Sequence, residues 1–243
     1  AVELSILNLA SLKSVRDFSA DINNRIPHLD VLVNNAAIMA VPQRMLSEDG
    51  YELQFATNHL GHFALSAALL PLLLKSPAPR IVTVSSIAHR YGSLNFDDLQ
   101  SEQNYEGWAA YGTTKLANLL FAFELSRRAK ASHLPLSSIA CHPGVSKTNI
   151  LRSGPTMGKK TIRTYLSEIF TQQFAQTDAE GALPVIHATT SPTARNGDYF
   201  GPDGILEIRG KPARAKPTLK AQDENLARQL WEISETLTNL KCL

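Results

Sequence analysis

The sequence predicts an α/β domain in which helices cover both faces of a mainly parallel β-sheet. Short apolar runs alternate along the 243 residues with longer helical patterns, the arrangement of repeated strand–helix–strand units. With 44% apolar and 19% charged residues, the chain can bury a sizeable core. No stretch has the composition of a linker, so we expect a single domain over residues 1–243.

The expected elements follow one another along the whole chain. Residues 2–9 alternate like a strand, and residues 11–26 form an amphipathic helix pattern with Ser11 as its N-cap. Further strands are expected at 29–37, 80–88 and 136–148, the last running into a loop. Further helices are expected at 47–76 with a bend at Pro71, and at 107–131, 161–174, 178–190 and 221–239, with a Gly- and Pro-rich turn at 199–212.

Composition argues against several classes of partner. The 24 Lys and Arg balance 22 Asp and Glu, so we expect neither a nucleic acid nor an anionic membrane as partner. Cys141 and Cys242 form no disulfide framework, which suits a reducing compartment and leads us to expect a cytoplasmic protein. The longest apolar run, 63–74, is too short to span a bilayer. His59 and His62 lack a third ligand nearby, so we expect no metal site, and such histidines are more often packed or solvated than catalytic.

Polar residues gather where the expected strands end. Ligands of open parallel sheets bind beyond the carboxyl ends of the strands. The residues at these ends are Asn34, Asn35, Ser85, Ser86 and the loop that begins at His142. Chain segments far apart in sequence are therefore expected to converge on one cleft.

One helix pattern carries a tyrosine and a lysine among small and apolar residues. Tyr111 and Lys115 are four positions apart and share a helix face. A buried phenol beside a snorkelling lysine explains the pair as structure. A phenol whose proton is moved during catalysis explains it as function. The pair alone does not decide between the two.

Five motifs in a fixed order favour the functional explanation. They are VNNAA (33–37), TNHLGHF (57–63), IVTVSS (81–86), YGTTK (111–115) and HPGVSKT (142–148). Together they resemble the short-chain dehydrogenase/reductase family over essentially the whole chain. The resemblance is strongest to the branch of the retinol dehydrogenases and protochlorophyllide reductase, where a longer segment, here 87–110, separates the catalytic serine from the tyrosine.

The resemblance implies four catalytic residues. Tyr111 would be the general acid or base, and Lys115 would lower the pKa of the phenol and hold the nicotinamide ribose. Ser86, chosen over Ser85 as the second serine of such a pair, would hydrogen-bond the substrate oxygen. Asn58 would hold a water of a proton relay, although taken singly it is better explained as a bond to a neighbouring strand.

The resemblance also implies a nicotinamide cofactor, NADP or NAD, with NADP slightly favoured by the branch. Besides Tyr111 and Lys115, the implied contacts on the adenine and ribose side are Asn8, Asn35, Ala36 and Ala37, and those at the nicotinamide are Pro143, Gly144, Val145 and Thr148. Asn8 stands where the family commonly has Asp, and Ala37 where it usually has Gly.

One part of the family pattern is not in the printed sequence. The family begins with a strand and a Gly-rich turn that holds the pyrophosphate, whereas the first glycine here is Gly50. We therefore expect a Rossmann-type three-layer α/β/α sandwich that lacks its first βαβ portion, either as a fragment of a longer enzyme or as a short product. The printed chain by itself is expected to bind NAD(P) weakly, and an upstream membrane anchor stays open.

The expected function is hydride transfer between NAD(P)(H) and a small-molecule carbonyl or alcohol. The substrate is expected to be apolar, retinal-like, aromatic or lipid-like, because residues after 150 that should cover the cleft are largely apolar. One alternative is a non-catalytic binding or regulatory protein that keeps the fold. A narrower alternative, suggested only by the branch, is light-dependent reduction of a tetrapyrrole. Assembly into a homo-oligomer stays open.

Overall fold

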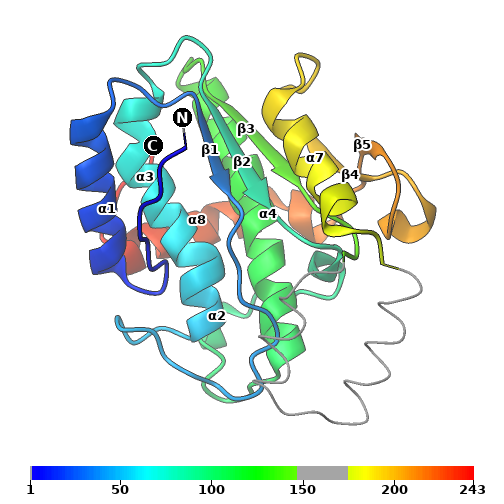
Figure 1. The fold of residues 1–243 in the computed structure, drawn as a ribbon. Coiled ribbons are helices and arrows are strands. Elements are labelled where there is room, and N and C mark those ends of the chain that lie inside the picture. The colour runs from blue at the N-terminus through cyan, green and yellow to red at the C-terminus, as the bar shows by residue number, and fades with distance from the viewer. Residues whose placement is uncertain (1, 147–174) are drawn as a thin grey trace.

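The computed structural model describes residues 2–146 and 175–243, and in these residues it contains one five-stranded sheet (Figure 1). The strands lie in the order of the sequence, the first four parallel and the last antiparallel. Their bounds are β1 (Val31–Asn34), β2 (Arg80–Val84), β3 (Ser137–Cys141), β4 (Tyr199–Pro202) and β5 (Pro212–Arg214). The predicted α/β class with a largely parallel sheet is confirmed.

Helices cover both faces of this sheet. The α-helices are α1 (Leu12–Arg25), α2 (Leu53–Phe55), α3 (Gly61–Leu73), α4 (Gly107–Ala131), α7 (Asp178–Thr190) and α8 (Glu224–Thr238). The shorter turns are a π-helix, η1 (Ala56–Leu60), and the 3₁₀ turns η2 (Ile87–Arg90), η3 (Phe96–Asp98), η4 (Ile205–Glu207) and η5 (Lys220–Gln222).

Alternate residues of β2 show which helices lie on which face. Ile81 packs with Phe121 of α4, whereas its neighbour Val82 packs with Ala188 of α7. Because successive side chains of a strand point to opposite faces, α4 and α7 lie on opposite sides of the sheet, as Figure 1 shows. Helix α1 packs on α3, and α8 packs on α4. The Ser11 hydroxyl accepts the Ser14 N–H at 3.3 Å, which confirms the predicted N-cap of α1.

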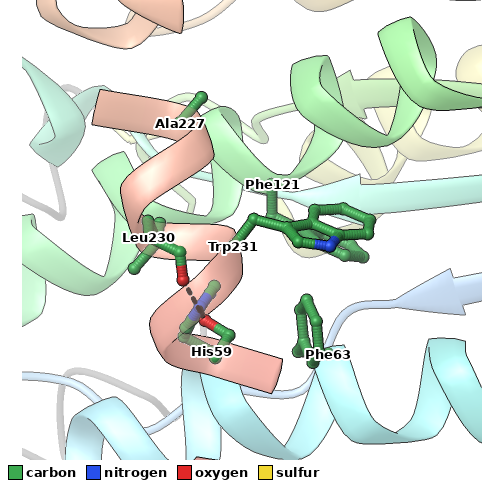
Figure 2. Close-up of a pocket in the computed structure, with 7 residues that line it drawn as sticks. His59, Phe63, Phe121, Ala227, Leu230 and Trp231 are labelled. Carbon is green, nitrogen blue, oxygen red and sulfur yellow. Dashed lines mark hydrogen bonds between the residues drawn. The ribbon is translucent and has the colours of Figure 1, made fainter. Parts of the chain in front are cut away.

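An aromatic cluster joins α8 to η1, α3 and α4 (Figure 2). Trp231 stacks on Phe121 with ring centroids 5.8 Å apart, and Phe63 meets both rings edge-on. His59 is buried in the same cluster, with its Nε2 2.8 Å from the Ser234 hydroxyl. Since that hydroxyl donates to a backbone carbonyl, His59 Nε2 is the donor. Burial lowers the pKa of His59 to about 3, so it is a neutral core residue.

The structure corrects the expectation of a strand at residues 2–9. Residues 2–8 have no strand pairing, and Val2, Leu4 and Ile6 are 100%, 96% and 93% exposed. Alternating residues favour an extended chain, but a strand also needs a partner for its backbone groups. No strand of the described residues lies beside β1 on its outer edge.

The helix expected over 47–76 is also corrected. It begins only at Leu53, because the Glu52 carboxylate accepts the N–H groups of the first helical turn while Leu46 and Glu52 form an isolated bridge. The π-helix η1 then interrupts it, which the sequence pattern does not signal. Pro71 lies in the last turn of α3.

The segment 199–212, expected as a turn, holds β4 and the start of β5, since its first residues are buried and pair with β3. The helix expected at 161–174 lies outside the described residues. Among the described helices, none combines the length and the apolar character needed to cross a bilayer.

Candidate active site

The carboxyl ends of β1, β2 and β3 open onto a cavity of about 970 Å³. Of the residues predicted for the site, those that line it are Asn35, Ala36, Ala37, Ser86, Tyr111, Lys115, Pro143, Gly144 and Val145. They come from four separate chain segments, as predicted from the strand ends. The cavity also extends over Val33 and Val84 on the sheet face next to α7.

Helix α4 places Tyr111 and Lys115 on the wall of this cavity. The Glu106 carboxylate accepts the Ala109 N–H at 2.6 Å and so fixes the first turn of the helix. The Lys115 ammonium lies 5.6 Å from the centre of the Tyr111 ring and donates to the Val84 carbonyl at 3.2 Å. The chain thus holds the two side chains one helical turn apart and at the end of β2.

Burial controls the protonation of both groups. It raises the pKa of Tyr111 to about 12, against a smaller lowering by the Ser86 hydroxyl. It lowers the pKa of Lys115 to about 8, against a smaller raising by Cys141. Lys115 is not among the groups that shift the pKa of Tyr111 in this structure, so the expected lowering of the phenol pKa by Lys115 stays a prediction. The phenol is protonated at neutral pH.

The two serines after β2 have different roles. The Ser85 hydroxyl is buried and donates to the Lys115 carbonyl at 2.7 Å, which ties α4 to the sheet. The Ser86 hydroxyl accepts the Ala88 N–H at 3.2 Å as the cap of η2, and it lies within hydrogen-bond reach of the Tyr111 phenol, whose pKa it lowers. This difference supports the choice of Ser86 over Ser85 as the residue that contacts substrate.

Asn58 lies behind the cavity and not on its lining. Its amide accepts the Ile38 N–H at 2.9 Å, and donates to the Ile38 carbonyl at 2.8 Å and to Thr114 Oγ1 at 3.0 Å. It therefore joins η1 to the loop after β1 and to α4. Its place in a proton relay stays a prediction.

Of the predicted cofactor contacts, Asn8 is not brought into the site. Asn8 makes local bonds, donating its N–H to Ser14 Oγ and accepting the Ala10 N–H, and it is not on the lining. Thr148 lies outside the described residues.

Hydrogen bonds with Ile208 and Gln176 hold the Pro143–Gly144 loop in place. Gly144 has a φ of +67°, and a Cβ there would lie 2.3 Å from the Ile208 carbonyl oxygen, so only glycine fits. The Val145 N–H donates to that same carbonyl at 2.8 Å. The Gln176 amide donates to the Pro143 carbonyl at 2.6 Å.

Sequence reasoning missed the apolar wall of the cavity. Met39, Tyr91 and Trp108 line it, and the Trp108 ring meets the Tyr111 ring edge-on with centroids 6.3 Å apart. The available signal was the spacing of three residues between Trp108 and Tyr111, which places both on one helix face.

Comparison with known proteins shows which family the chain belongs to. The family model described as short chain dehydrogenase matches residues 2–157. Human retinol dehydrogenase 14 is 42% identical over 236 residues, which are 96% of this chain and 66% of that protein. Human retinol dehydrogenase 13 is 38% identical, covering 97% and 68%. Zebrafish (Danio rerio) polyprenol dehydrogenase is 36% identical, covering 99% and 71%.

Solved structures agree in fold. A protein from Mycobacterium paratuberculosis superposes with a TM-score of 0.78 at 37% identity, covering all of this chain and 77% of that one. A carbonyl reductase from chicken fatty liver superposes with a TM-score of 0.54 at 21% identity, covering 79% and 71%, and shows the fold alone. The chain spans about two thirds of the length of the first of these relatives, human retinol dehydrogenase 14. It belongs to the short-chain dehydrogenase family and, within that family, is similar to the retinol dehydrogenases.

Proposed function

We propose that this chain forms the catalytic part of an NAD(P)-dependent oxidoreductase that interconverts an alcohol and a carbonyl compound. The observation that carries the proposal is the convergence of Ser86, Tyr111 and Lys115 on one cavity with the Pro143–Gly144 loop. Each feature has a structural explanation when taken singly. Together they place a proton donor, a hydrogen-bond donor and a cation around one space large enough for ligands.

The residues present suit the nicotinamide and ribose part of such a cofactor. The loop after β1 offers small side chains, Ala36 and Ala37, next to the Asn35 amide, which leaves the backbone accessible to a ribose. The Lys115 ammonium can donate to ribose hydroxyls, and the backbone of the Pro143–Gly144 loop can meet a carboxamide. NADP is proposed over NAD from the family branch alone.

The bound nicotinamide would supply or accept the hydride. Tyr111, protonated at neutral pH, gives its proton to the carbonyl oxygen of the substrate as the carbon is reduced. Ser86 donates a hydrogen bond to the same oxygen and stabilises its developing charge. Lys115 stabilises the resulting phenolate electrostatically until it regains a proton from solvent. In the oxidation direction the same residues act in reverse, and Tyr111 must first lose its proton.

An apolar substrate fits the apolar part of the cavity wall beside these groups. Met39, Trp108 and Ile186 line the cavity, and aromatic and thioether side chains favour flat or long apolar molecules. The retinol and polyprenol in the names of two relatives are alcohols of this kind. A panel of carbonyls tests this: small polar ketones turned over faster than aromatic or lipid-like aldehydes would contradict it.

The decisive experiment replaces Tyr111 by Phe in the full-length protein. The change removes one oxygen, so the fold should persist while turnover falls by roughly two to four orders of magnitude. Oxidation of NADPH and NADH, followed separately, measures it. Tyr91→Phe is the matched control, because Tyr91 lines the same cavity without a proposed proton transfer. Unchanged turnover in Tyr111→Phe would favour a non-catalytic binding protein.

A further inference from the structure

Three charged or polar side chains from distant segments meet behind the Pro143–Gly144 loop. Glu207 Oε2 lies 2.7 Å from Arg90 Nη2 and 3.1 Å from His142 Nε2. Glu207 Oε1 accepts the Lys216 N–H at 3.2 Å, so both carboxylate oxygens are used. His142 is fully buried, while the Glu207 side chain is 18% exposed. None of the three lines the cavity, and the mechanism above does not use them.

The hydrogen bonds fix how His142 is protonated. Its Nδ1 accepts the Gly144 N–H at 3.2 Å, so that nitrogen carries no proton. The proton is therefore on Nε2, which donates to Glu207. Burial raises the pKa of Glu207, but hydrogen bonds from His142 and the Lys216 N–H, together with the charge of Arg90, outweigh it and hold the pKa at about 2. The carboxylate is charged over the whole physiological range.

The backbone around Glu207 is shaped to reach the loop. Leu206 and Glu207 have φ values of 55° and 58°, the left-handed conformation that is strained for residues with a side chain. Arg90 Nη1 donates to the Leu206 carbonyl at 3.1 Å, which holds this turn. Ile208, which follows Glu207 in the chain, offers the carbonyl that accepts the Val145 N–H.

Arg90 is the last residue of η2, the turn that Ser86 caps. Glu207 thus connects the turn that follows Ser86 with the loop that bears Gly144, and both segments line the cavity. Both segments must keep their separation for a substrate oxygen and a nicotinamide to meet in a reactive geometry.

We propose that Glu207 is a positioning residue that holds the Pro143–Gly144 loop at a fixed distance from Ser86, through Arg90 on one side and His142 on the other. This inference rests on the proposed function for its catalytic consequence. Its structural part, the fixation of the loop, stands on the contacts alone.

The test compares three substitutions in the full-length protein. Glu207→Gln keeps the size of the side chain and removes its charge. His142→Asn places an acceptor near the position of Nδ1 and keeps the bond from Gly144, whereas His142→Gln places a donor near Nε2 and keeps the bond to Glu207. Glu235→Gln is the control, because Glu235 is also a buried carboxylate, bound by Trp231 and Lys241 away from the cavity.

Amide hydrogen exchange reports on the loop without reference to activity. Glu207→Gln should speed exchange of the Gly144 and Val145 N–H groups at least tenfold and leave exchange in α8 unchanged. His142→Asn should protect Gly144 better than His142→Gln does. Glu235→Gln should show the opposite pattern to Glu207→Gln, with faster exchange in α8 and an unchanged loop.

Steady-state kinetics then report on the catalytic consequence. Glu207→Gln should lower kcat at least tenfold with little change in KM for the carbonyl substrate, and Glu235→Gln should lower neither. Unchanged exchange at Gly144 and Val145 in Glu207→Gln overturns the inference, as does an equal loss of kcat in the control. If the unaltered protein reduces no carbonyl with either cofactor, the proposed function fails, and the exchange data still decide whether Glu207 holds the loop.

Discussion

Replacing Lys115 by Met should stabilise the protein while it destroys the proposed activity. Lys115 is 2% exposed and places its ammonium in a site where burial lowers its pKa from 10.5 to about 8. Methionine fills nearly the same volume without a charge. The Val84 carbonyl, which accepts from Lys115, also accepts from the Asn118 amide at 3.2 Å, so the substitution leaves no unpaired acceptor.

The pKa change sets the size and the pH dependence of the effect. A group whose pKa is lower in the folded than in the unfolded state binds more protons when unfolded, so the free energy of unfolding rises with pH between about 8 and 10.5. At pH 7 the buried ammonium costs about 3 kcal/mol, and at pH 9.5 about 1 kcal/mol. Lys115→Met should therefore gain up to about 3 kcal/mol at pH 7, and less at pH 9.5.

Urea denaturation at both pH values measures this gain. Lys130→Met is the matched control, because Lys130 is exposed on the same helix and its replacement should change stability by less than about 0.5 kcal/mol. A Lys115→Met variant that is less stable than the unaltered protein at pH 7 would refute the reasoning. So would a gain of equal size at both pH values.

Three further predictions concern stability. Burial lowers the pKa of His59 to about 3 and that of His62 to about 4. The free energy of unfolding should therefore fall as the pH drops below about 6.5, by about 2 kcal/mol for each histidine at pH 5. His59→Phe should remove about half of this pH-dependent loss in urea titrations. Asn58→Ala leaves the partly buried N–H and carbonyl of Ile38 without their partner and should cost about 2 kcal/mol, read as a lower Tm; an unchanged Tm would contradict the bonding described. Gly61→Ala would bring a Cβ within 2.3 Å of a backbone oxygen and should cost about 1 to 3 kcal/mol in the same assay, whereas a neutral effect would show that α3 can shift there.

The sequence predicted well those features that depend on local pattern. Apolar runs predicted β1, β2 and β3, because strands buried in a parallel sheet need little beyond apolar β-branched residues. Polar residues at their ends predicted a shared cavity, because parallel strands bring their carboxyl ends to one edge. The spacing of Tyr111 and Lys115 predicted their common face.

Features that depend on a distant partner could not be read from the sequence. Residues 2–9 alternate as a strand does, yet pairing is decided by a neighbour and not by the pattern. Asn58 lies in the π-helix η1, and its side chain bonds to Ile38 and Thr114, which are distant in sequence. Glu207 lies within a segment that was expected as a turn, and its role appears only when Arg90, 117 positions away, is placed beside it.

The two tryptophans occupy positions that make them independent optical reporters. Trp108 is half-buried on the cavity wall, so its fluorescence should respond to any aromatic or nicotinamide ligand that enters. Trp231 is 2% exposed and stacked on Phe121, so its emission should change only when α8 separates from α4. Two variants, each with one tryptophan replaced by Phe, would then give separate signals. The variant that keeps Trp108 would report ligand occupancy, and the variant that keeps Trp231 would report global unfolding.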